Sequence, residues 1–129
     1  MQLRDFESAD LDGVYRMLTA SGWAHRIESA GYLQRLVQVS HRTAVAMLDD
    51  QVVGFARAIT DGLSNGYLSM VVVAKPWRRQ GVGRALVQHI VGSDASVTWV
   101  LRAGRPGAPE FFAKLGFVAS VDAMEMRRR

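Results

Sequence analysis

The sequence predicts one α/β domain that spans residues 1–129 and is built on a mixed β-sheet. First, 129 residues are enough for one hydrophobic core and too few for two domains. Second, segments with apolar residues at helical spacing alternate with short, strand-like apolar runs. Third, the apolar run Met70–Ala74 is followed by Gly81 and Gly83 and then by an amphipathic segment. This order is typical of a strand–helix–strand unit with two parallel strands.

Four segments have the spacing of helices. Ser8 or Asp10 can cap the first helix, and Ser21-Gly22 ends it. Gly116 lies in the usual position after the last helix. The predicted helices are the one that Ser8 or Asp10 caps, which runs to about Thr19, and then Glu28–Val39, Gly81–Val91 and Ala108–Lys114.

Strand-like runs occupy much of the remaining chain. Asp49-Asp50 is a hairpin signal between two of them, and Gly54 indicates a bulge. Met70–Ala74 is apolar without alternation, which is typical of a central strand buried on both faces. The predicted strands are Met1–Phe6, Arg42–Leu48, Gln51–Ile59, Tyr67–Ala74, Val97–Leu101 and a closing pair, Phe117–Val121 and Ala123–Met126. The predicted order is therefore β-α-α-β-β-β-α-β-α-β-β.

Composition excludes several classes of protein. Hydrophobic residues make up 49% of the chain, and there is no cysteine, which excludes disulfides, thiolate metal sites and a cysteine nucleophile. No apolar run reaches the ~18–20 residues of a membrane span. The first ten residues lack the apolar stretch of a secretory signal, so we expect a cytoplasmic protein. The three histidines have no paired spacing, so no metal site is expected.

The chain is basic, with a formal net charge of +4 and a sequence pI of about 10.1. A basic chain raises the alternative of nucleic-acid binding. However, the excess is small, and three of the charges form the terminal run 127–129. Lys75, Arg78, Arg79 and Arg84 gather beside a glycine turn. This local cluster favours a small polyphosphate over a long polymer, so neither a nucleic-acid partner nor a membrane partner is expected.

The segment Arg78-Arg79-Gln80-Gly81-Val82-Gly83 predicts an anion site. Gly81 and Gly83 lack Cβ, so the backbone can approach a ligand closely. The helix that follows begins with free N–H groups and the positive end of its dipole. A dinucleotide-binding fingerprint would need a small residue where Leu86 stands, and a P-loop would need Gly-Lys-Ser/Thr, which is absent. A glycine-rich connection that binds no ligand remains the alternative.

Two segments of the chain resemble the GNAT superfamily of acetyl-CoA-dependent N-acyltransferases. They are VVVAKPWRRQGVGRALV, which begins at Val71, and GAPEFFAKLGF, Gly107–Phe117. The resemblance implies a GNAT-like fold and acetyl-CoA as co-substrate. The amides of Arg79–Arg84 would hold the pyrophosphate, the strand Val71–Val73 would pair with the pantetheine arm, and Val97–Leu101 would splay away to admit it. The implied cofactor-binding residues are Val71, Val72, Val73, Arg78, Arg79, Gln80, Gly81, Val82, Gly83, Arg84 and Phe112.

The resemblance also implies direct attack of an amine on the acetyl thioester. A backbone N–H at a strand bulge near Val71 or Val72 would stabilise the developing oxyanion, with Val72 as the candidate. Phe112 stands where the family has a tyrosine that protonates the leaving thiolate. Phe112 could instead pack on the pantetheine, and Tyr67 or Ser69 could supply the proton.

No residue is assigned with certainty as the general base. Asp61, Glu110 and His25 are the three candidates, because they fall near the strand, the later helix and the acceptor region of such proteins. The lack of a clear base and of a tyrosine at position 112 leaves a catalytically silent acyl-CoA-binding domain as the main alternative. The expected acceptor is a small-molecule amine. The alternating residues Met124–Met126 could pair with another subunit in a homodimer.

Overall fold

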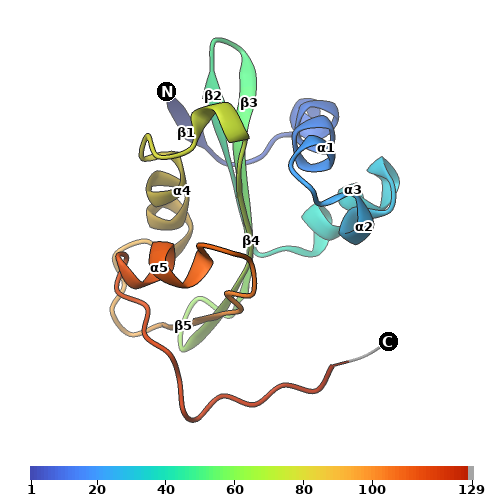
Figure 1. The fold of residues 1–129 in the computed structure, drawn as a ribbon. Helices are drawn as coiled ribbons and strands as arrows, with labels where there is room; N and C mark the ends of the chain where they lie inside the picture. Colours follow the sequence, from blue (N-terminus) through green and yellow to red (C-terminus); the bar gives the residue numbers. More distant parts are fainter. Residues whose placement is uncertain (128–129) are drawn as a thin grey trace.

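The computed structural model describes residues 1–127 as a five-stranded sheet with helices on both faces (Figure 1). α1, α2 and α3 cover one face, and α4 and α5 lie on the other. The strands are β1 (Gln2–Arg4), β2 (Arg42–Leu48), β3 (Gln51–Thr60), β4 (Asn65–Val73) and β5 (Thr98–Leu101). The helices are α1 (Leu11–Ala20), α2 (Ala24–Ile27), α3 (Ala30–Val39), α4 (Val82–Val91) and α5 (Ala108–Ala113), with short 3₁₀ turns η1 (Ser8–Asp10) and η2 (Lys75–Trp77).

The sheet has the strand order β1-β2-β3-β4-β5 and is mixed. The first four strands pair antiparallel, and β5 pairs parallel to β4, as the predicted strand–helix–strand unit requires. Asp49 and Asp50 both have positive φ (49° and 61°), which matches the tight turn of a two-residue hairpin. The α/β class with a mixed sheet is therefore confirmed.

Two hydrophobic layers hold the helices to the sheet. On one face, Leu18 of α1 and Leu33 of α3 pack with Phe55 of β3. On the other face, Leu86 and Ile90 of α4 pack on the alanines of β2 and β3. Val71 and Val73 contact the α4 layer, whereas Met70 and Val72 contact the α1–α3 layer. Met70–Ala74 is thus covered on both faces, as its continuous apolar run predicts.

Gly54 allows α4 to approach the sheet. A Cβ at this position would lie 2.8 Å from Leu86 Cδ1. The bulge that Gly54 indicates is present one residue earlier. Ala46 is opposite Gly54 and Met47 is opposite Val52, so Val53 is the extra residue.

Some predicted boundaries are wrong near the N-terminus. Of the two predicted caps, Asp10 occupies the N-cap position of α1, which begins at Leu11 after the 3₁₀ turn η1. Its carboxylate accepts hydrogen bonds from Arg4 (2.7 and 2.9 Å) and from the Glu7 amide, and not from the first amides of α1. The region between the first two predicted helices contains the short helix α2. α3 begins at Ala30, where Ser29 caps it by accepting a hydrogen bond from the Tyr32 amide (3.1 Å).

The closing strand pair, Phe117–Val121 and Ala123–Met126, is wrong. Residues 117–127 form no strand. The physical reason is that the apolar side chains after Phe117 have no surface to pack on. Val118, Val121, Met124 and Met126 are 76–97% exposed, and alternation of residues alone does not supply a partner strand.

Within residues 1–127, every helix is too short or too polar to span a lipid bilayer.

Candidate functional site

The candidate site begins where β4 and β5 part. β5 pairs only with Asn65–Leu68, although β4 continues to Val73. Among residues 1–127, no strand pairs with the outer edge of Ser69–Val73. Strand edges carry unpaired N–H and C=O groups that can bind an extended ligand. The open edge of β4, which we define as Ser69–Val73, is therefore a place for such a ligand.

Two hydrogen bonds define which backbone groups face this open edge. Ala74 donates its N–H to the Val53 carbonyl on β3 (2.9 Å), so its amide points away from the edge. Because successive residues of a strand point their amides to opposite sides, Val72 also faces β3, whereas Val71 and Val73 face the open edge. The Val73 carbonyl accepts a hydrogen bond from Arg78 Nε (3.0 Å), which agrees with this orientation.

The bulge of β4 lies two residues before its predicted place. Arg57 is opposite Met70 and Ala58 is opposite Leu68, so Ser69 is the extra residue. This register directs the Val72 N–H at β3 and so does not favour it as the oxyanion donor, and the choice of donor stays a prediction. Val71, the other residue of the predicted pair, has its amide on the open edge.

The loop after β4 forms a concentration of free amides. Arg79 and Gly81 have positive φ (65° and 85°), and α4 begins at Val82 with no side-chain cap. The first backbone bond of this turn runs from the Ala85 amide to the Gly81 carbonyl (3.1 Å). In the described part of the chain, the amides of Arg79–Arg84 have no acceptor outside water. Such a turn at a helix N-terminus is suited to an anion.

Two side chains of this loop hydrogen-bond to backbone carbonyls and so hold the loop in its conformation. Arg78 binds the end of β4, and Gln80 Nε2 donates to the Pro76 carbonyl (3.2 Å). Gly81 has open space around its missing Cβ, so its glycine is required by φ alone.

Gly83 has a different reason for being glycine. A Cβ there would lie 2.8 Å from Cζ of Phe111, so Gly83 lets α5 pack against the start of α4. The prediction that Gly83 serves close approach of a ligand therefore has a competing structural explanation.

Phe112 belongs to an aromatic cluster on α5. Its ring lies 4.9 Å from that of Phe111 and 5.7 Å from that of Phe117, both edge-on. The cluster packs partly buried against the α4 layer. Position 112 thus has a packing function and offers no proton, while the predicted contact with pantetheine stays a prediction.

The candidate bases do not converge on one point. The Asp61 carboxylate accepts hydrogen bonds from the Leu63, Ser64 and Asn65 amides and from the Ser64 hydroxyl. These bonds hold the pKa of Asp61 far below its usual range. A base for an amine works best with a pKa near neutrality, so Asp61 organises the β3–β4 turn instead.

Glu110 and His25 are exposed, on α5 and α2 respectively, and neither makes a side-chain hydrogen bond within residues 1–127. Tyr67 is half-buried on β4, two residues before the bulge.

Arg57 of β3 is absent from the predicted site, yet it lies directly beside the bulge. Its Nη1 donates to the Ser40 hydroxyl (3.0 Å), and its Nε is buried without a partner. The sequence carries a signal for it. Arg57 alternates with Phe55 and Ile59 and so stands on a sheet face where apolar residues are expected.

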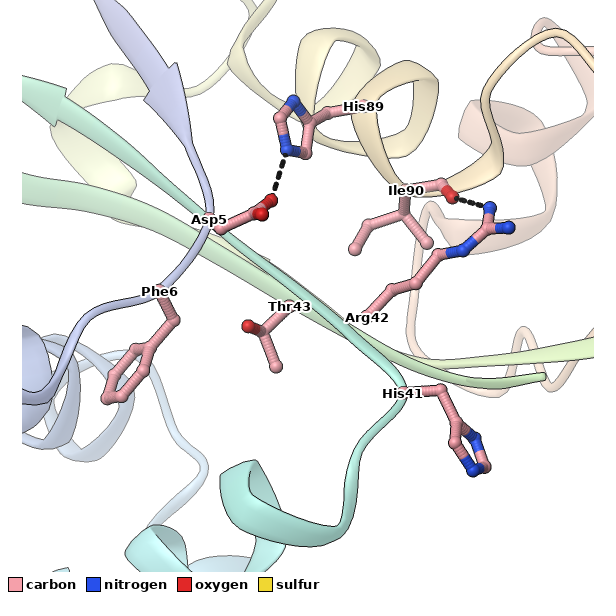
Figure 2. Close-up of a pocket in the computed structure, with 7 residues that line it drawn as sticks. All are labelled: Asp5, Phe6, His41, Arg42, Thr43, His89 and Ile90. Atoms are coloured by element: carbon pink, nitrogen blue, oxygen red, sulfur yellow. Dashed lines mark hydrogen bonds and ion pairs between the residues drawn. The ribbon is translucent and has the colours of Figure 1, made fainter. Parts of the chain in front are cut away.

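A separate cavity lies at the other edge of the sheet, between the end of β1, β2 and α4 (Figure 2). The Asp5 carboxylate and His89 Nε2 meet there at 2.9 Å, and Arg42 Nη1 donates to the Ile90 carbonyl at 2.7 Å. None of the predicted site residues lines this cavity. Across residues 1–127, no three His, Asp or Glu side chains gather in a way that could hold a metal ion.

Comparisons with known proteins agree with this geometry. Residues 39–119 match the sequence model of the family described as the acetyltransferase (GNAT) domain. A PanD regulatory factor from Salmonella typhimurium LT2 is 30% identical over 96 residues, which cover 70% of this chain and 75% of that protein.

Two solved structures show the same fold. A GNAT-family acetyltransferase from Streptococcus pneumoniae TIGR4 superposes with a TM-score of 0.82 at 23% identity, covering 99% of this chain and 96% of that chain. A ribosomal-protein-alanine N-acetyltransferase from Brucella melitensis biovar Abortus 2308 gives a TM-score of 0.76 at 20% identity, with 100% and 99% coverage. With the family match spanning more than half of its residues, the chain belongs to the family of GNAT acetyltransferase domains.

Proposed function

We propose that the chain is an N-acetyltransferase that transfers the acetyl group of acetyl-CoA to the primary amine of a small-molecule acceptor. The observation that carries the proposal is the continuity of the open β4 edge with the amide loop. The edge leads from Ser69 to Val73, and the loop of free amides, Arg79–Arg84, follows after η2. An extended arm with a pyrophosphate at its end needs these two features in this order.

The residues present suggest how acetyl-CoA would be held. The Val71 and Val73 backbone groups would pair with the pantetheine arm, and the amides of Arg79–Arg84 would bind the pyrophosphate. Acetyl-CoA supplies the activated acetyl thioester. The nitrogen of the neutral amine attacks the thioester carbon, the C–S bond breaks, and the thiolate leaves.

The chain must handle two protons in this reaction. At pH 7, removing the proton of an amine with a pKa of ~10.4 costs about 4–5 kcal/mol. Glu110, His25 or a water chain could accept it. The thiolate of CoA, with a pKa near 8.5, leaves unprotonated at a cost of only about 2 kcal/mol at pH 7. A phenylalanine at position 112 is therefore compatible with turnover, and Tyr67 and Ser69 are the hydroxyl candidates for a proton donor.

The second candidate function is a catalytically silent acyl-CoA-binding regulator. Two observations favour it: Phe112 has no proton to give, and the 30% identical relative is named as a regulatory factor. In this case acetyl-CoA would bind without transferring its acetyl group to any amine.

Release of free thiol from acetyl-CoA separates the two functions. The chain contains no cysteine, so the protein contributes no background to a thiol reagent. The purified protein is first titrated with acetyl-CoA by calorimetry and is then incubated with acetyl-CoA and a panel of amines. Amine-dependent thiol release supports the enzyme. Saturable binding with no release across the panel supports the regulator, and absence of binding contradicts both.

A further inference from the structure

The guanidinium of Arg57 is a half-buried cation without an anionic partner. Nη1 binds the Ser40 hydroxyl, Nε is buried without a partner, and Nη2 has no hydrogen bond to residues 1–127. No carboxylate of the described chain lies within 4.0 Å of it. Burial lowers the pKa of Arg57, which the nearby Tyr32 and Tyr67 partly offset. A buried charge is normally paired with a group of opposite charge. The Arg57 guanidinium therefore lacks an anionic hydrogen-bond acceptor.

Arg57 stands at the place where the strands separate. It is opposite Met70, next to the Ser69 bulge, and the pairing of β4 with β5 ends at Leu68. Its bond to Ser40, which follows α3, places the side chain on the face covered by α1–α3. An anionic group that accepts hydrogen bonds from Arg57 on this face would lie beside the start of the open β4 edge.

Further arginines gather on the same face. The guanidinium of Arg105, from the β5–α5 connection, lies 3.9 Å from the centre of the Trp23 ring, and Arg105 Nη2 donates to the Gly22 carbonyl (3.2 Å). Arg26 lies 5.9 Å from the same ring, and Arg35 lies over Tyr32 at 5.5 Å.

These arginines contact aromatic rings instead of acids. None of Arg26, Arg35 and Arg105 has a carboxylate within 4.0 Å in the described chain. Burial, and then the charges of Arg26 and Arg78, lower the pKa of Arg105, as expected for cations crowded together. Clustered like charges raise the local concentration of ligands of opposite sign.

We infer that the acceptor amine carries a carboxylate, and that Arg57 is the residue that binds it. The inference rests on the proposed acetyl transfer and narrows its substrate to amino acids and related amino carboxylates. A guanidinium presents a planar set of donors that matches a carboxylate, and Arg57 Nη2 makes no hydrogen bond within residues 1–127. Arg26 and Arg105, both over the Trp23 ring, add positive charge to the face covered by α1–α3.

The test compares amines that differ only in the carboxylate. Thiol release is measured for a panel of amino acids and for the corresponding amino-acid amides, at equal concentrations of the neutral amine. For the wild-type protein we expect kcat/KM to be about 10- to 100-fold higher for the carboxylates, the effect of one charged hydrogen-bonded pair. In Arg57→Gln the ratio of kcat/KM for carboxylates to kcat/KM for amides should fall to near one, mainly because KM for the carboxylates rises. Arg57→Lys should retain part of the preference.

Arg16→Gln is the matched control, because Arg16 is an exposed arginine on α1. It should keep the wild-type preference. Thermal melts and acetyl-CoA titrations of all variants show that the fold and the co-substrate site are intact. If Arg57→Gln does not fold, the inference is tested by comparing the carboxylate preference of Arg57→Lys with that of the wild type on the same panel of amines.

The outcomes separate this inference from the proposed function. If amino-acid amides or simple alkylamines are acetylated with the same kcat/KM as the amino carboxylates, the inference is overturned and acetyl transfer stands. If the carboxylates are preferred but Arg57→Gln and Arg57→Lys keep the preference, the assignment of Arg57 is overturned. If no amine of either kind releases thiol, the proposed function itself fails.

Discussion

At the scale of single residues, Gly81 is the sharpest test of the anion loop. Its φ of +85° is in the region that L side chains rarely adopt, and a Cβ would meet no atom within 4 Å. Gly81→Ala therefore adds backbone strain of about 1–2 kcal/mol without a clash. We expect acetyl-CoA affinity to fall about tenfold as the amides of the loop lose their alignment. Calorimetric titration measures it.

Gly92→Ala is the matched control for this prediction. Gly92 ends the same helix, has a φ of +69° and also has open space where a Cβ would stand. Its φ of 69° and ψ of −158° are adopted almost only by glycine, so its substitution should lower stability at least as much and leave acetyl-CoA affinity unchanged. Equal losses of affinity in both variants would mean that general strain, and not the anion loop, controls binding.

Phe112 leads to a second prediction at the residue scale. Phe112→Tyr adds a hydroxyl at position 112, where the resemblance to the family implies a tyrosine. If protonation of the thiolate limits turnover, kcat for thiol release should rise up to about tenfold at pH 7. The gain should shrink as the pH approaches 8.5, where the thiolate leaves without help. Phe111→Tyr, on the same helix, should show no such pH-dependent gain, and a flat profile for Phe112→Tyr would exclude this limitation.

At the scale of secondary-structure elements, the contact between α4 and α5 depends on Gly83. Gly83→Ala would place a Cβ 2.8 Å from the Phe111 ring, so we expect a loss of about 1–3 kcal/mol in the free energy of unfolding. In a Phe111→Leu background the same change should cost much less, because the smaller side chain leaves room. Urea denaturation of the four proteins measures this coupling. Additive losses would contradict the packing explanation.

The connection between β1 and α1 has a pH-dependent stability. The Arg4 hydrogen bonds lower the pKa of Asp10, with burial opposing and the Glu7 amide and the Arg4 charge assisting. A lowered folded-state pKa means that Asp10 stabilises the fold above about pH 4 and that this stabilisation is lost as the pH falls below the unfolded value.

Asp10→Asn should therefore lower the free energy of unfolding by about 1–3 kcal/mol at pH 7, and the difference from wild type should narrow as the pH falls from about 4 toward about 2.5. Asp12→Asn, an exposed change in the first turn of α1, should show little difference at either pH. A gap between wild type and Asp10→Asn that stays constant across this acid range would rule out the ionised pair as its source.

At the scale of the whole molecule, the sequence predicts those features that depend on local pattern. The apolar run Met70–Ala74 marks the central strand, and Gly81 marks the turn, because burial on both faces and a positive φ each leave a direct trace in residue type. The direction of the Val72 amide and the bulge at Ser69 leave no such trace in residue type, because both depend on the register of β4 with β3. Arg57 leaves a sequence signal in its alternation with Phe55 and Ile59, but its position beside the bulge depends on the same register.

The C-terminal segment shows the other limit of sequence patterns. Alternation at 117–126 predicts a strand pair, but a strand also needs a neighbour, and none is provided within residues 1–127. β5 stays the edge strand of the sheet, with Val100 partly exposed. An ion pair between Arg102 Nε and Glu125 (3.1 Å) keeps the segment near the end of β5. Exposed apolar alternation beside an open strand edge is the pattern that pairs between molecules.

From this arrangement we expect the protein to dimerise through its C-terminal segment. Sedimentation equilibrium should show a concentration-dependent dimer for the wild type and a monomer for the double variant Val121→Asp, Met124→Asp, because a charge cannot be buried unpaired in such a contact. Val39→Asp is the control, since this side chain is also exposed but lies at the end of α3. A wild type that remains monomeric at high concentration would contradict the expectation. A control variant that also dissociates the dimer would show that the contact lies on another surface.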